Sequence, residues 1–233
     1  MGSIPASRTK QRSGHDQKRK PPDMAQNVLP VELADRLAPG GSALVLIDMQ
    51  NDFCAGGGYI DVVAGKDVSA GASLVPILQA LIDAARAADV PVIWIRADYS
   101  FDKIPPSMSV VSQARGITAE CCKPGTWGAE WFGITPLRGE KIITKHTYSG
   151  FADTDLNSTL AQLKVQSVVF GGVTTQVCVE STVRDAHSAG YFCIVPHDAV
   201  ASHTPSLHEA ALTNIRFFLG DVCASADVLS AWR

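Results

Sequence analysis

The chain has 233 residues, of which 46% are apolar and 18% are charged, which is typical of a globular protein with one sizeable core. Its net charge of −3 combines about +4 in residues 1–24 with a mildly acidic remainder, which gives no indication of nucleic-acid binding. No stretch approaches the roughly 18 apolar residues that a membrane span needs.

Residues 1–28 are polar, basic and rich in Gly, Ser and Pro, which predicts a disordered basic tail before a domain at residues 29–233. The run from Lys18 to Lys20 resembles a nuclear-import signal, although a solvated tail is the favoured interpretation, and Met24 offers an alternative start. The tail lacks the apolar segment of a secretory signal. Because the six cysteines form no CxxC pair or disulfide framework, we expect reduced thiols in a cytoplasmic protein.

After the tail, short apolar runs alternate with longer amphipathic stretches. The apolar runs predict strands at residues 43–48, 92–95, 141–144, 167–170, 191–195 and 222–224. Helical spacing predicts helices at residues 69–88, 156–163, 177–189 and 206–218, and a last helix that Ser225 caps. Strands that are apolar on both faces and separated by helices predict a three-layer α/β domain, with a parallel sheet of about six strands and helices on both faces.

In such a sheet, functional side chains gather beyond the carboxyl ends of the strands. Asp48 ends the first predicted strand, Lys145 follows the third, and Cys178 follows the fourth. A thiol ionises more readily at a helix N-terminus and beside a cation, and a carboxylate can accept its proton and later activate water. We therefore expect a nucleophile, Cys178, a base, Asp48, and a lysine that holds both in their charged forms. Each residue also has an ordinary structural interpretation, as a buried thiol, a helix-capping acid or a solvated lysine.

Two segments resemble the isochorismatase-like cysteine hydrolases. Residues 46–53 (LIDMQNDF) are similar to the first-strand motif of that family, and residues 172–179 (GVTTQVCV) are similar to its nucleophile loop, with Lys145 between them in the family's order. The resemblance spans about residues 40–224. It implies a Rossmann-like sheet and an Asp48–Lys145–Cys178 triad. It also implies a cis peptide before Thr174, an oxyanion hole formed by the backbone N–H groups of Thr174 and Cys178, a small-molecule substrate and a homo-oligomer.

The chain departs from one branch of this family at the end of the second strand. Nicotinamidases carry an Asp-x-His metal motif there, whereas this chain reads Asp98-Tyr99-Ser100 and has no histidine between His15 and His146. We therefore expect neither a metal nor another cofactor. Isochorismatases that hydrolyse a vinyl ether commonly lack the nucleophilic cysteine, so Cys178 favours amide chemistry.

The remaining motifs narrow the expected substrate. Residues 56–59, 148–151 and 177–185 look like segments of ureidoacrylate amidohydrolases, whereas Arg96 and residues 123–125 look more like biuret hydrolases. The resemblance thus implies a cysteine amidohydrolase that cleaves a C–N bond of a small ureido or carbamoyl compound through a thioester. The alternatives are an isochorismatase or other small-amide hydrolase and, in a different class, a catalytically silent binding protein on the same scaffold.

A substrate carboxylate that enters a small pocket needs a cation or several donors. Arg96 is the predicted anchor, because it leaves the second strand at the same sheet edge and its planar fork suits a carboxylate or a urea oxygen. An ion pair with Asp98 is the alternative role. The other predicted substrate contacts are Phe53, Trp127, Tyr148 and Gln176.

Overall fold

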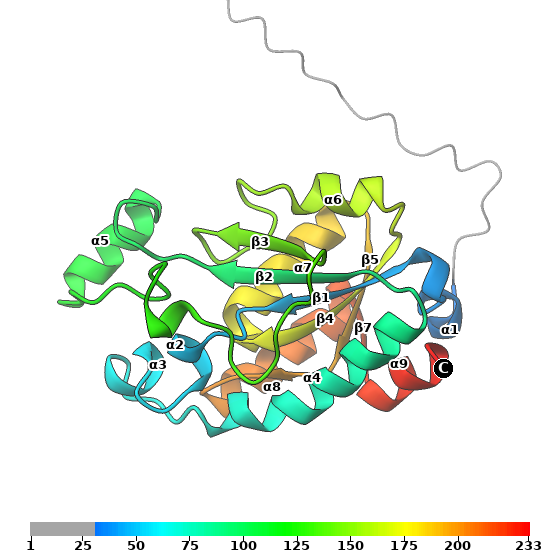
Figure 1. Cartoon of the computed structure of the whole chain (residues 1–233), viewed down its shortest axis with the longest axis horizontal. Helices are drawn as coiled ribbons and strands as arrows, with labels where there is room; N and C mark the ends of the chain where they lie inside the picture. The colour runs from blue at the N-terminus through cyan, green and yellow to red at the C-terminus, as the bar shows by residue number, and fades with distance from the viewer. Residues whose placement is uncertain (1–30) are drawn as a thin grey trace, which may run out of the picture. The chain divides into compact units, whose positions relative to one another are not determined.

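The computed structural model describes residues 31–233, so the predicted tail at residues 1–28 lies outside the described residues (Figure 1). The domain is built around a parallel sheet of seven strands, in the order β3-β2-β1-β4-β5-β7, with β6 beside β4. The strands are β1 (Ser42–Ile47), β2 (Val92–Ala97), β3 (Lys141–Lys145), β4 (Ser167–Val173), β5 (Phe192–Pro196), β6 (Val200–Ala201) and β7 (Gly220–Cys223).

Helices cover both faces of the sheet, which confirms the predicted three-layer α/β architecture (Figure 1). The α-helices are α1 (Leu33–Arg36), α2 (Asn51–Cys54), α3 (Tyr59–Val62), α4 (Ser69–Ala87), α5 (Pro106–Ala114), α6 (Leu156–Gln162), α7 (Glu180–Ser188), α8 (Pro205–Asn214) and α9 (Ser225–Ala231). Two π-helical turns, η3 (Thr175–Val179) and η4 (Ile215–Leu219), adjoin α7 and α8. No helix of the described chain has the length and apolarity needed to cross a bilayer.

Strand β1 explains why the apolar runs are continuous. Its side chains alternate between two cores: Leu44 and Leu46 pack with α4, whereas Val45 and Ile47 pack with residues of α6 and α7. A strand buried on both faces therefore needs apolar residues at every position.

The sheet edge beyond β1 and β4 depends on a glycine. Gly172 pairs with Ile47 and has φ +114°, and a Cβ atom there would lie 2.1 Å from the Ile47 carbonyl oxygen. Any residue with a Cβ atom at position 172 would push β4 away from β1. The residue after β1, Asp48, has φ 54°, a left-handed conformation that is uncommon for a residue with a side chain.

The structure changes some of the predicted elements. The helix predicted at residues 177–189 begins earlier, as the π-helical turn η3. Ser225 does not cap α9: it is the first residue of that helix, and its hydroxyl donates to Asp198 at 2.6 Å. The carboxylate of Asp227 fastens this helix start instead, because it accepts from the Ala224 backbone N–H at 3.0 Å. The short elements α2, α3 and β6 span too few residues to give a periodic signal.

Candidate active site

The structure brings the three predicted catalytic side chains together at the carboxyl edge of the sheet. Lys145 Nζ lies 2.8 Å from Asp48 Oδ2 and 3.4 Å from Cys178 Sγ. Asp48 follows β1, Lys145 ends β3, and Cys178 lies in η3 directly after β4. Asp48 and Lys145 are fully buried, and Cys178 is 3% exposed. Three strands that share one direction thus deliver a carboxylate, an ammonium and a thiol to one point.

Burial and the neighbouring charges shift the pKa of each ionisable group in this cluster. Burial raises the pKa of Asp48, although the charge of Lys145 and a hydrogen bond with Cys178 act in the opposite direction. It also raises the pKa of the Cys178 thiol to about 12, more than the neighbouring ammonium lowers it. For Lys145, burial favours the neutral amine, but the charges of Asp48 and Cys178 together outweigh it and raise its pKa. These directions favour an ammonium on Lys145 and a protonated thiol on Cys178 in the resting site, and the role of Lys145 in holding Cys178 as a thiolate stays a prediction.

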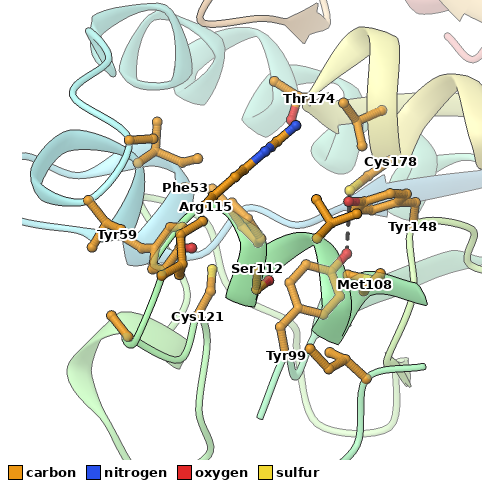
Figure 2. A pocket seen from close by; sticks show the side chains of 18 of the residues that line it. Phe53, Tyr59, Tyr99, Met108, Ser112, Arg115, Cys121, Tyr148, Thr174 and Cys178 are labelled. Carbon is orange, nitrogen blue, oxygen red and sulfur yellow. Dashed lines mark hydrogen bonds between the residues drawn. The ribbon is translucent and has the colours of Figure 1, made fainter. Parts of the chain in front are cut away.

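Tyr99 is a fourth member of the cluster, which the sequence motifs did not identify. Lys145 Nζ donates to the Tyr99 hydroxyl at 2.6 Å, and this hydroxyl lies 3.6 Å from Cys178 Sγ (Figure 2). Burial, followed by the charges of Cys178 and Asp48, raises the pKa of Tyr99 well above its usual value, so the phenol keeps its proton. The phenol has one proton, and the Thr147 carbonyl oxygen accepts it at 3.1 Å, so the Cys178 thiol can act as the donor in the contact with Tyr99. Tyr99 is the second residue after β2, at the carboxyl edge of the sheet, and this position is the signal that could have found it.

Cys178 opens onto a cavity of about 300 Å³ (Figure 2). Two predicted substrate contacts, Phe53 and Tyr148, line this cavity together with Thr174. The Val173–Thr174 peptide bond is cis, at the position where the family resemblance implies one. Most of the remaining lining residues are apolar, and they come from α3, α5, the segments that adjoin these two helices and η3.

Arg96 does not line the cavity at Cys178, so the geometry does not support its predicted role as the substrate anchor. Its Nε donates to Thr144 Oγ1 at 3.0 Å, and its side chain lines a second cavity that does not include Cys178. The alternation of side chains along β2 explains this placement, because Arg96 faces the same side as Trp94 of the α4 core, whereas Cys178 belongs to the opposite core.

Trp127 and Gln176 do not line the cavity at Cys178 either. Trp127 is 51% exposed, and its carbonyl oxygen accepts from Asn51 Nδ2 at 2.8 Å. Gln176 Oε1 is buried without a hydrogen-bond partner within residues 31–233. Neither residue has an observed geometry that supports a substrate contact.

Within the described residues, one group of potential metal ligands lies beside the cavity, formed by Asp52, Cys121 and Cys122. The Asp52 carboxylate already accepts the backbone N–H groups of Tyr59 at 3.0 Å and of Cys122 at 2.5 Å. Burial strongly raises the pKa of the Cys122 thiol, which opposes the thiolate that a metal would need. We therefore interpret Asp52 as a structural residue whose hydrogen bond with Cys122 connects α2 to the loop after α5. All six cysteines are free thiols, as predicted.

Comparisons with known proteins show which family the chain resembles. Residues 42–227 match the isochorismatase domain family. A ureidoacrylate amidohydrolase of Cronobacter sakazakii is 33% identical over 210 residues, which cover 83% of this chain and 90% of that protein. A cysteine hydrolase from Pseudomonas syringae pv. phaseolicola 1448A has a TM-score of 0.73 at 26% identity and covers 87% of this chain and 94% of its own. N-carbamoylsarcosine amidase from Thermoplasma acidophilum has a TM-score of 0.64 at 26% identity, with coverage of 79% and 96%.

The relatives are thus named as hydrolases, and two of them as enzymes that cleave C–N bonds. The family match covers nearly the whole described domain, including all three strand ends that carry Asp48, Lys145 and Cys178. On this combination of sequence, fold and site, the chain belongs to the isochorismatase family.

Proposed function

We propose that the chain is a metal-independent cysteine amidohydrolase that cleaves a C–N bond of a small ureido or carbamoyl compound. The observation that carries this proposal is the buried cluster of Asp48, Lys145 and Cys178, of which Cys178 lines an open cavity. A buried ion pair is rarely a source of net stability, so its place beside a thiol in a cavity favours a catalytic role. The named activities of the ureidoacrylate amidohydrolase and N-carbamoylsarcosine amidase relatives support the same chemistry.

The first half-reaction forms a thioester. The sulfur of Cys178 attacks the carbonyl carbon while Asp48, whose raised pKa makes it a stronger base than an ordinary aspartate, takes the thiol proton. The C–N bond then breaks, Asp48 gives the proton to the leaving nitrogen, and ammonia or an amine departs. Backbone N–H groups of Thr174 and Cys178 are proposed to hold the developing oxyanion.

The second half-reaction hydrolyses the thioester and regenerates the free enzyme. Asp48 removes a proton from water as the water oxygen attacks the thioester carbon, and the same proton returns to the sulfur as the C–S bond breaks. Lys145, which stays an ammonium, lies 2.8 Å from the carboxylate and 3.4 Å from the sulfur, so it stabilises negative charge on either atom. The hydroxyl oxygen of Tyr99 lies 3.6 Å from the same sulfur.

A panel of compounds tests this proposal. We expect ammonia release from N-carbamoyl amino acids or ureidoacrylate, and little turnover of nicotinamide or isochorismate. The Cys178→Ala variant should release no ammonia above background. Turnover of isochorismate alone would replace the proposal with the vinyl-ether alternative, and failure on every compound with an ordinary thiol-labelling rate at Cys178 would favour a silent binding protein.

A further inference from the structure

The cavity at Cys178 has one charged side chain in its lining, that of Arg115, within the described part of the chain. Arg115 follows the last residue of α5, and Figure 2 shows its side chain extended across the cavity with the nitrogen end toward Thr174. Thr174 stands next to the cysteine at which the reaction is proposed to occur. A guanidinium in this position can reach a group attached to the reacting carbonyl.

Backbone hydrogen bonds at the end of α5 fix the position of the Arg115 backbone. The Arg115 N–H donates to Val111 and Ser112 carbonyl oxygens at 3.2 Å, and Gly116, at φ +65°, then turns the chain back. The N–H of Ile117 closes this turn on the Ser112 carbonyl oxygen at 3.0 Å. The guanidinium itself has no ion-pair or hydrogen-bond partner among residues 31–233. Arg115 is an exposed residue of the cavity lining, and a forked cation without a protein partner can pair there with a carboxylate of a ligand.

The rest of this wall is apolar. Ile60 and Val63 come from α3 and its end, and Met108 and Val111 come from α5. Val63 is 40% exposed and Val111 is 48% exposed, so an apolar group placed against them would remove apolar surface from water. A small, wholly polar compound such as biuret would use neither this surface nor the guanidinium.

We propose that the substrate is an N-carbamoyl or ureido acid with an apolar substituent, whose carboxylate binds Arg115 and whose substituent packs against Ile60, Val63, Met108 and Val111. This inference rests on the proposed amidohydrolase function and names its substrate class. Arg115 takes the specificity role that the sequence assigned to Arg96. The apolar wall separates this class from the short ureido acids.

Kinetics with matched arginine variants test the carboxylate contact. The probes are N-carbamoyl-leucine and its methyl ester, assayed by ammonia release. Arg115→Met should lower kcat/KM for the acid by about 10- to 100-fold, mainly through KM, as expected for a lost charge-assisted hydrogen bond, and Arg115→Lys should recover part of it. The ester should change by less than about threefold. The control Arg96→Met, in the second cavity, should match the wild type on both probes. Equal losses on acid and ester, or no loss on the acid, would overturn the inference.

The apolar wall is tested with the same assay. N-carbamoyl-leucine should exceed N-carbamoylglycine in kcat/KM by about tenfold or more, because its extra carbons bury against the wall. Val111→Ser should narrow that ratio, whereas Val31→Ser, an exposed valine outside the cavity, should not. Equal kcat/KM values for the two acids in the wild type would overturn the apolar part of the inference.

A binding measurement keeps this inference distinct from the proposed function. N-carbamoyl-leucine is titrated calorimetrically into Cys178→Ala and into Cys178→Ala/Arg115→Met. Tighter binding to the first protein, by about tenfold or more, supports the Arg115 subsite even if the wild type turns over no ureido compound, in which case only the proposed function fails. Equal affinities, or no binding to either protein, would overturn the subsite, whatever the wild-type turnover.

Discussion

The two sides of the cavity at Cys178 are built in different ways. The chemical side comes from the ends of β1, β3 and β4, and its three charged or nucleophilic side chains are at most 3% exposed. The opposite side comes from α3 and α5, and neither helix contains a buried residue. Reaction chemistry is therefore tied to the core, whereas substrate recognition depends on segments with few core contacts. Changes on the first side should abolish turnover or stability, and changes on the second should shift substrate preference.

The largest expected effect separates Cys178 from the other buried thiols. Cys178→Ala should lower ammonia release by at least about 10³-fold, because the covalent route disappears, while the melting temperature changes little. Cys193→Ala is the matched control, since Cys193 is also a buried cysteine but lies in β5. It should retain near-normal turnover. Near-normal turnover in Cys178→Ala would mean that the cluster is not the reacting centre.

Two lysine variants, one on each side of the cavity, compare how much each side contributes to the free energy of unfolding. Lys145→Met leaves Asp48 fully buried without its counter-charge and should lower the free energy of unfolding by about 3–5 kcal/mol. Lys123 pairs with Glu120 in the loop beyond α5, and its side chain is 54% exposed, so Lys123→Met should cost less than about 1 kcal/mol. Urea denaturation measures both. Equal losses in the free energy of unfolding would show that the Asp48–Lys145 pair matters no more to stability than the surface pair of Lys123 and Glu120.

The pH dependence should report the burial of Asp48. Its folded pKa is raised, so the carboxylate that acts as base is lost at a higher pH than an ordinary aspartate would be, and kcat/KM should fall about tenfold per pH unit below that point. Above it, the rate should stay level into the alkaline range, because the pKa of Cys178 is about 12 and that of Lys145 is raised. An alkaline change near pH 8.5, the range of an ordinary thiol, would contradict this protonation state.

The smallest expected effect concerns Tyr99, which joins the two sides of the cavity. Tyr99→Phe removes a hydroxyl that accepts from Lys145 at 2.6 Å, donates to the Thr147 carbonyl oxygen at 3.1 Å and lies 3.6 Å from the sulfur. We expect kcat to fall by about tenfold with KM nearly unchanged, since one neutral hydrogen-bonding group is lost. Tyr148→Phe, at 43% exposure in the same cavity, should instead act mainly on KM. A KM effect for Tyr99→Phe without a kcat effect would make it a substrate contact.

The same contrast explains what could be predicted from the sequence. Strand β1 was recognisable because both of its faces are buried, and Asp48, Lys145 and Cys178 were recognisable because each stands where a strand ends. The placement of Arg96 in the second cavity could not be predicted, because its sheet face depends on which core Trp94 joins.

Arg115 was not assigned at all, since α5 buries none of its residues and the sequence does not show which cavity it lines. A segment without buried residues shows no hydrophobic periodicity from which its orientation could be predicted. Homo-oligomeric assembly and the absence of a metal remain predictions from the family resemblance.

The central claim, covalent catalysis by Cys178, is tested most directly by acid quench during turnover of N-carbamoyl-leucine, followed by mass spectrometry of the peptides. We predict one added acyl group on the peptide that contains Cys178, which disappears as substrate is exhausted and never forms in Cys178→Ala. A chain that turns over while the Cys178 peptide stays unmodified, or that carries the acyl group on another cysteine, would contradict the account.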